Sequence, residues 1–132
     1  MNLYEIMFDH YSQKDSERGT LTYLIAKSDE DVYEWIKAEH ELKNGRQIYC
    51  SYEDREEDDE VYYTYDDDNL EIEETFKERM IRLQGEMNDD DAELDDLYYG
   101  KTLYGWELIR ENISLNGIEI LKTIMINVEE VL

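Results

Sequence analysis

Two acid triplets are the residues of this chain whose type and spacing most suggest chemistry, because clustered carboxylates bind divalent cations. Residues 66–68 and residues 89–91 each consist of three consecutive Asp. A calcium loop of the EF-hand type needs oxygen ligands at positions 1, 3, 5 and 12 and Gly at position 6. Counted from the first Asp of either triplet, position 6 is Glu71 or Leu94. Both frames fail, so the sequence predicts no specific metal site and no cofactor.

His10, His40 and Cys50 are the remaining candidates for metal ligation or catalysis. Neither His belongs to an HxxxH pattern, and no second Cys stands at ligand spacing. We expect His10 to end a strand, His40 to end a helix, and the lone thiol to be buried. The sequence contains no phosphate-binding Gly loop, no GxSxG elbow and no nuclease signature. These observations predict that the protein is not an enzyme.

Acidic residues are concentrated between residues 53 and 96. This segment holds 21 of the 36 acidic residues and four of the 13 basic residues, so it carries −17 of the net charge of −23. Nucleic acid and anionic membranes would repel a surface of that sign. The sequence therefore predicts a basic protein surface as the partner, with no direct binding to nucleic acid or membrane.

The acid runs lie inside the chain, between strand and helix signals, and alternate with Tyr residues that can anchor an interface at low entropy cost. Alternate carboxylates on a strand repeat at about 6.6–7 Å, whereas duplex DNA carries one charge per roughly 1.7 Å of its axis. A folded acidic face can thus approach the charge density of nucleic acid. The plain alternative is a solvated surface without a partner. The predicted partner-binding surface comprises Glu53, Asp54, Glu56, Glu57, Asp58, Asp59, Glu60, Asp66, Asp67, Asp68, Asp89, Asp90, Asp91, Asp95 and Asp96.

In these acid runs the chain resembles the small acidic proteins that phages make against host defence, the DNA-mimic anti-CRISPR and anti-restriction inhibitors. The resemblance is one of charge, size and layout, and involves no shared motif. It implies an absence of catalysis, a site of action in the host cytoplasm, and blockade of a basic nucleic-acid channel. A Cas9-type effector is the favoured target, because its channel presents Arg and Lys to phosphates and bases. A restriction enzyme is the other target that the resemblance implies.

Two further classes of function stay open. The first is an acidic adaptor or chaperone-like partner that escorts a basic nucleic-acid-handling protein without blocking it. Excess DNA would displace a mimic but would leave such an adaptor in place. The second is an enzyme, which a single tight, stoichiometric metal site would support.

The elements that position these acids are predicted from hydrophobic periodicity. Alternating apolar residues predict strands over residues 2–10 and 20–27, paired antiparallel. In the second strand, Leu21, Tyr23 and Ile25 are expected on one face.

Further strands are expected over residues 47–52, 61–65 and 102–109, with a helix as the weaker alternative for the last. The acids of residues 53–60 are then expected to form the loop of a hairpin between residues 47–52 and 61–65. Residues 128–132 are expected to be frayed or a short edge strand.

Helices are predicted from capping residues and from apolar steps of three and four. Ser28 followed by three acids predicts a helix start, and residues 44–45 are expected to end this helix or to form a turn. A helix over residues 73–84 is predicted with a favourable pair of Glu73 and Lys77 four residues apart. Short helices are also expected after Asn88 or Asp89 and after Ser114.

Length and composition place the whole in one domain. At 132 residues the chain fits a single α+β domain, residues 1–132, with a small antiparallel sheet and two to four short helices. The absence of Pro excludes a Pro-rich linker. One Cys rules out an internal disulfide, and the N-terminus lacks the pattern of a signal peptide, so we expect a cytoplasmic location.

Overall fold

The computed structural model of the chain describes residues 1–10, 17–41, 47–48, 58–84, 102–124 and 128–131. Its elements in chain order are β1 (Asn2–His10), β2 (Glu17–Ala26), α1 (Asp29–Ile36), a π-helical turn η1 (Lys37–Glu41), β3 (Gln47–Ile48), β4 (Val61–Tyr65), β5 (Glu71–Thr75), α3 (Phe76–Leu83), β6 (Thr102–Arg110), α5 (Leu115–Ile124) and β7 (Val128–Glu130).

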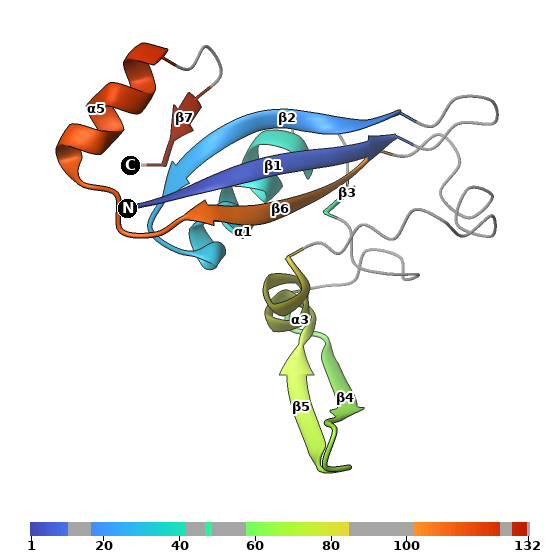
Figure 1. Ribbon diagram of the computed structural model, residues 1–132. Helices are drawn as coiled ribbons and strands as arrows, with labels where there is room; N and C mark the ends of the chain where they lie inside the picture. Colours follow the sequence, from blue (N-terminus) through green and yellow to red (C-terminus); the bar gives the residue numbers. More distant parts are fainter. Residues whose placement is uncertain (11–16, 42–46, 49–57, 85–101, 125–127, 132) are drawn as a thin grey trace.

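A five-stranded sheet in the order β3-β6-β1-β2-β7 forms the body of the fold (Figure 1). β1 lies at its centre and pairs antiparallel with β2 and with β6. The outer strands β7 and β3 pair in parallel with β2 and β6, respectively. The predicted α+β fold is confirmed. Its sheet is antiparallel at the centre and has a parallel strand at each edge. The edge strands β3 and β7 are too short for the sequence to reveal the direction in which they pair.

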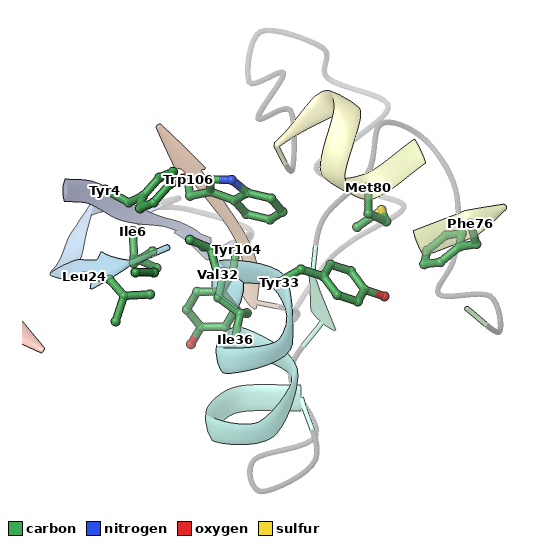
Figure 2. Packing of buried hydrophobic residues seen from close by; sticks show 11 residues of the cluster. Tyr4, Ile6, Leu24, Val32, Tyr33, Ile36, Phe76, Met80, Tyr104 and Trp106 are labelled. Atoms are coloured by element: carbon green, nitrogen blue, oxygen red, sulfur yellow. The ribbon is translucent and has the colours of Figure 1, made fainter. Parts of the chain in front are cut away.

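The main core lies between this sheet and α1, and extends to α3. On β1, Tyr4 and Ile6 point to the same side, because side chains two apart on a strand share a face. Figure 2 shows Phe76 and Met80 of α3 lying beyond Tyr33 in the same cluster. The buried members are Tyr4, Ile6, Leu24, Ala26, Val32, Tyr33, Ile36, Phe76, Met80, Tyr104 and Trp106.

A second, smaller cluster covers the other face of the sheet. Leu3 of β1 and Ile25 of β2 are buried there against Ile118 of α5. The prediction that Leu21 shares this face with Ile25 is wrong. Ile6 pairs with Thr22 but Met7 pairs with Thr20, which leaves Leu21 as an extra residue on β2. This β-bulge shifts the alternation, so Leu21 packs against the main core instead.

The first helix begins as predicted. The Ser28 side chain accepts a hydrogen bond from the Asp31 N–H at 3.3 Å, which satisfies one of the unpaired donors of the first turn. Val32, Tyr33 and Ile36 are fully buried, whereas Trp35 is half-buried at the edge of the core. The expected ending at residues 44–45 lies outside the described residues.

Strands β4 and β5 form a separate two-stranded hairpin that projects from the body together with α3 (Figure 1). The predicted hairpin between residues 47–52 and 61–65 is therefore wrong, since β3 pairs with β6 and β4 pairs with β5. The physical reason is loop length. Residues 66–70 close β4 onto β5 through a short turn, and a shorter loop loses less entropy on closure.

The start of α3 also differs from the prediction. Ile72 and Glu73 belong to β5, and the helix begins at Phe76 after the cap residue Thr75. Thr75 and Glu78 form a capping box, in which the Glu78 N–H donates to Thr75 Oγ1 at 3.2 Å and the Thr75 N–H donates to Glu78 Oε1 at 3.0 Å. Because Glu73 precedes the helix, the predicted pair with Lys77 on one helical face is wrong.

The C-terminal elements follow the sequence pattern closely. β6 is a strand whose alternate residues Tyr104, Trp106 and Leu108 all face the main core, so the helical alternative for this segment is wrong. Ser114 precedes α5 and accepts the Gly117 N–H at 3.0 Å, as expected for a cap. β7 is the expected edge strand. The helix predicted after Asn88 or Asp89 and the thiol of Cys50 lie outside the described residues.

Candidate partner-binding surface

The acidic residues that the structure describes are concentrated on the β4–β5 hairpin. Residues 58–75 contain nine acidic residues and no Lys or Arg. The two strands pair from Val61 opposite Thr75 to Tyr65 opposite Glu71. We define the acidic hairpin as residues 58–75.

Asp66 builds the turn at the tip of the acidic hairpin. The Asn69 N–H donates to the Asp66 carbonyl at 2.9 Å, and the Asp66 N–H donates to the Leu70 carbonyl at 3.0 Å. The Asp66 carboxylate accepts the N–H groups of Asp68 and Leu70 at 3.0 and 2.8 Å. Asn69 has a φ of 62°, the left-handed conformation that a three-residue hairpin loop requires. Asp66 therefore stabilises the turn, and Asp67 and Asp68 are exposed at its tip.

The base of the hairpin is held against α3 by two arginines. Glu74 is buried and accepts two hydrogen bonds from Arg82, from Nε at 3.0 Å and from Nη2 at 2.6 Å. The Arg79 guanidinium lies 5.0 Å from the centre of the Tyr62 ring, within the range of a cation–π contact. These contacts attach the hairpin to the helix that follows it.

Asp58 connects the hairpin to α1. Its carboxylate accepts the Tyr33 hydroxyl and pairs with the Lys37 ammonium, both at 2.5 Å. Its carbonyl accepts the Lys77 N–H at 3.2 Å. The structure therefore gives Asp58, a predicted partner-binding residue, a supporting role that its place in an acid run did not reveal.

Lys77 adds a second link between α3 and α1. Its ammonium pairs with Glu34 at 2.6 Å and with Glu30 at 3.0 Å. These hydrogen bonds, the one to Glu34 foremost, raise the pKa of Lys77 above its usual range. Lys77 thus neutralises acids of α1.

A third link joins α1, α3 and the sheet through Asp29. One of its oxygens, Oδ1, accepts the Trp106 indole N–H at 2.8 Å and the Gln84 amide at 3.0 Å. The backbone N–H of Trp106 also donates to the backbone carbonyl of Gln84 at 2.9 Å. The orientation of the hairpin on the body is therefore set by a buried aromatic residue and by directional hydrogen bonds.

Seven carboxylates of the acidic hairpin remain exposed. Within the part of the chain that the structure describes, none of them forms an ion pair. Large side chains are exposed among them, with Tyr63 at 62%, Tyr65 at 68% and Leu70 at 63%. The exposed acids are Asp59, Glu60, Asp66, Asp67, Asp68, Glu71 and Glu73.

The structure thus brings part of the predicted surface together. Asp59, Glu60 and residues 66–68 share one projecting hairpin, and Asp58 lies at its base. Sequence reasoning missed Glu71 and Glu73, although a Tyr-x-Tyr pattern before a turn and a Glu-x-Glu pattern after it signal cross-strand neighbours. The predicted residues Glu53, Asp54, Glu56, Glu57, Asp89, Asp90, Asp91, Asp95 and Asp96 lie outside the described residues.

Metal binding and membrane crossing can be judged only for the described residues. Among them no group of three or more His, Cys, Asp or Glu side chains is arranged to hold a metal ion. No helix within the described ranges is long and apolar enough to cross a membrane. The arrangement presents negative charge and aromatic rings on a projecting hairpin.

Comparison with known proteins finds one curated relative along nearly the whole chain. The SPbeta prophage-derived uncharacterized protein YoqY of Bacillus subtilis (strain 168) is 48% identical over 130 residues, which cover 98% of each chain. No protein-family model matches the sequence, and no solved structure matches it significantly.

Proposed function

The chain belongs to the family of the prophage-derived protein YoqY, and on that premise we propose that it is a non-enzymatic binding protein that occupies the basic, nucleic-acid-binding surface of another protein. The acidic hairpin is the part that makes contact. Asp67 and Asp68 enter a groove that otherwise holds phosphates, and the tyrosines beside them contact its walls.

The absence of Lys and Arg from the hairpin carries this proposal. A merely solvated acidic surface is expected to have its charges interspersed with Lys and Arg, as surface charges usually are. Among the described residues, Lys37 and Arg82 pair with acids at the base of the hairpin, and Arg79 lies over the Tyr62 ring. The exposed part is left uniformly negative, which favours rapid association with a positive groove and disfavours nucleic acid.

The prophage membership of the family supports a partner in host defence. A phage gene product that blocks a Cas9-type effector or a restriction enzyme has to compete with DNA for an Arg- and Lys-rich channel. A projecting hairpin suits such a channel because it reaches into a groove while the sheet body stays outside. We place the site of action in the cytoplasm of the host, where these enzymes meet DNA.

The test is displacement of a labelled short duplex from a purified Cas9-type effector and from a restriction enzyme. The parent protein is expected to displace the duplex from at least one of them. Asp67→Lys with Asp68→Lys is expected to abolish displacement without unfolding the chain, since both side chains are exposed at the tip.

A matched control separates the hairpin from total charge. Glu111→Lys with Glu129→Lys changes the net charge by the same amount at exposed positions of the sheet body. This control variant is expected to keep most of the displacement activity. If both double variants lose activity equally, total charge acts rather than the hairpin, and the proposal fails.

A second candidate is the acidic adaptor, which the exposed Tyr63, Tyr65 and Leu70 favour because phosphate mimicry alone does not need apolar contacts. An adaptor binds the basic protein beside its nucleic-acid site. In the displacement assay it would form a ternary complex with the duplex still bound, so one titration distinguishes the two functions.

A further inference from the structure

The acidic hairpin contains one chemical pattern three times, a Tyr directly across from a Glu. Tyr62 pairs with Glu74, Tyr63 with Glu73, and Tyr65 with Glu71. Directly paired residues of an antiparallel ladder have their Cβ atoms about 4.5–5.5 Å apart. Each pair therefore sets an aromatic face beside a carboxylate.

The protein itself shows what one of these pairs binds. The Tyr62–Glu74 pair is occupied by two arginines of α3, with Arg79 over the ring at 5.0 Å and Arg82 in a two-point hydrogen bond to the carboxylate. Both arginines lie on one helix, three residues apart. The contact is close enough that Glu74 is only 6% exposed.

The other two pairs lie on the opposite face, because side chains alternate along a strand. Tyr63, Tyr65, Glu71 and Glu73 are all exposed there, and no described cation pairs with either carboxylate. No described residue thus occupies these two pairs, whereas the chain fills the third pair of the same chemistry with its own arginines.

We infer that Tyr63, Tyr65, Glu71 and Glu73 form a docking surface for arginine side chains of a partner protein, presented three or four residues apart on a helix. This inference rests on the proposed function and specifies the chemistry of the partner. Tyr63 and Tyr65 are about 6.6–7 Å apart along the strand, and helix residues three or four apart are separated by about 5–6 Å. A helical partner can therefore place one arginine at each pair, whereas on the other face α3 places two arginines at a single pair.

Arginine fits this surface better than lysine for two reasons. Its planar guanidinium stacks on an aromatic face, and its fork of donors forms paired hydrogen bonds with a carboxylate. The ammonium of lysine is more strongly hydrated and forms no such fork. A second copy of the chain is disfavoured as the occupant, because each copy carries a net charge of −23.

The probes for the test are two labelled helical peptides of equal charge, one with arginines and one with lysines at the same positions three residues apart. Fluorescence anisotropy measures their affinity for the full-length protein. The arginine peptide is expected to bind about tenfold more tightly, since the stacking contacts are made by the guanidinium. Tyr63→Leu with Tyr65→Leu is expected to remove this preference, whereas Tyr63→Phe with Tyr65→Phe is expected to retain it.

Two charge-matched variants separate the pairs from general attraction. Glu71→Gln with Glu73→Gln is expected to weaken the arginine peptide several-fold more than Asp67→Asn with Asp68→Asn, which removes the same charge from the tip. Equal affinity for the two peptides, no binding of the arginine peptide, or equal effects of the two variants would each overturn the inference. The inference would also be overturned if the parent protein formed a dimer and the variant with Tyr63→Leu and Tyr65→Leu did not, because the surface would then bind a second copy of the chain. None of these results bears on duplex displacement, which tests the proposed function separately.

Discussion

Asp58 offers the clearest test of how the acidic hairpin is attached. Its carboxylate receives the hydroxyl of the fully buried Tyr33 and pairs with Lys37. Replacing Asp58 with Ala removes the acceptor from Tyr33 and the counterion from Lys37. The neighbouring Asp59 is exposed, and within the described residues it forms no ion pair, so Asp59→Ala is the matched control.

The expected magnitude follows from these contacts. A hydrogen bond to a charged acceptor contributes about 1.5–3 kcal/mol. The ion pair contributes at most about 1 kcal/mol, because both side chains keep some exposure, 25% for Lys37 and 28% for Asp58. We therefore expect Asp58→Ala to lower the free energy of unfolding by about 2–3 kcal/mol. Asp58→Asn keeps an acceptor for Tyr33 and should lower it by about 1 kcal/mol.

Urea unfolding followed by far-UV circular dichroism measures these differences. Asp59→Ala should stay within about 0.5 kcal/mol of the parent, or stabilise it slightly by relieving repulsion. Equal effects of Asp58→Ala and Asp59→Ala would refute the reasoning, because the carboxylate of Asp58 would then be no more than another solvated charge.

Three further predictions concern the scaffold. Met80→Ala should lower the free energy of unfolding by about 2–5 kcal/mol in the same urea assay, since Met80 is fully buried; a loss below about 1 kcal/mol would contradict that burial. Raising salt from low to physiological concentration should raise the melting temperature by screening repulsion, and a flat or falling melting temperature would mean that most acids are paired. Hydrogen bonds with the backbone of Thr75, and next with its side chain, lower the pKa of Glu78. The contribution of Glu78 to stability is therefore fully present above the ordinary carboxyl pKa and is lost as the pH falls through the lowered pKa. The stability difference between the parent and Glu78→Ala should therefore shrink on acidification, and a constant difference would exclude the capping role.

The sequence predicted the elements whose signals are local. Alternation identified β1, β2, β4 and β6, and cap residues identified the starts of α1 and α5, because each signal depends only on neighbouring residues. The errors arose where the secondary structure of a segment depends on the strand with which it pairs. Ile72 fits a helical stripe and a strand equally well, and only its position opposite Thr64 on β4 makes it part of a strand.

In the candidate site, too, local signals were predicted and contacts between distant residues were not. Charge density alone predicted an acidic surface from the residues between 53 and 96, of which the structure describes residues 58–84. It could not separate Asp58, which supports the hairpin, from Asp67, which is exposed at its tip, because that difference depends on Tyr33 and Lys37 far along the chain. Glu71 and Glu73 were missed because their relation to the tyrosines exists only across the two strands.

The central claim, that the acidic hairpin competes with nucleic acid for a basic groove, is tested most directly by a salt series. DNA releases condensed counterions on binding, so its affinity falls with a log–log slope of about −0.9 per phosphate contacted. The hairpin carries a lower and less regular charge density and should release fewer ions. We predict that the protein and a short duplex exclude each other from the same target, and that the protein gains relative to the duplex as salt rises toward physiological concentration. Simultaneous binding of both, or a steeper loss of affinity for the protein than for the duplex, would contradict the claim.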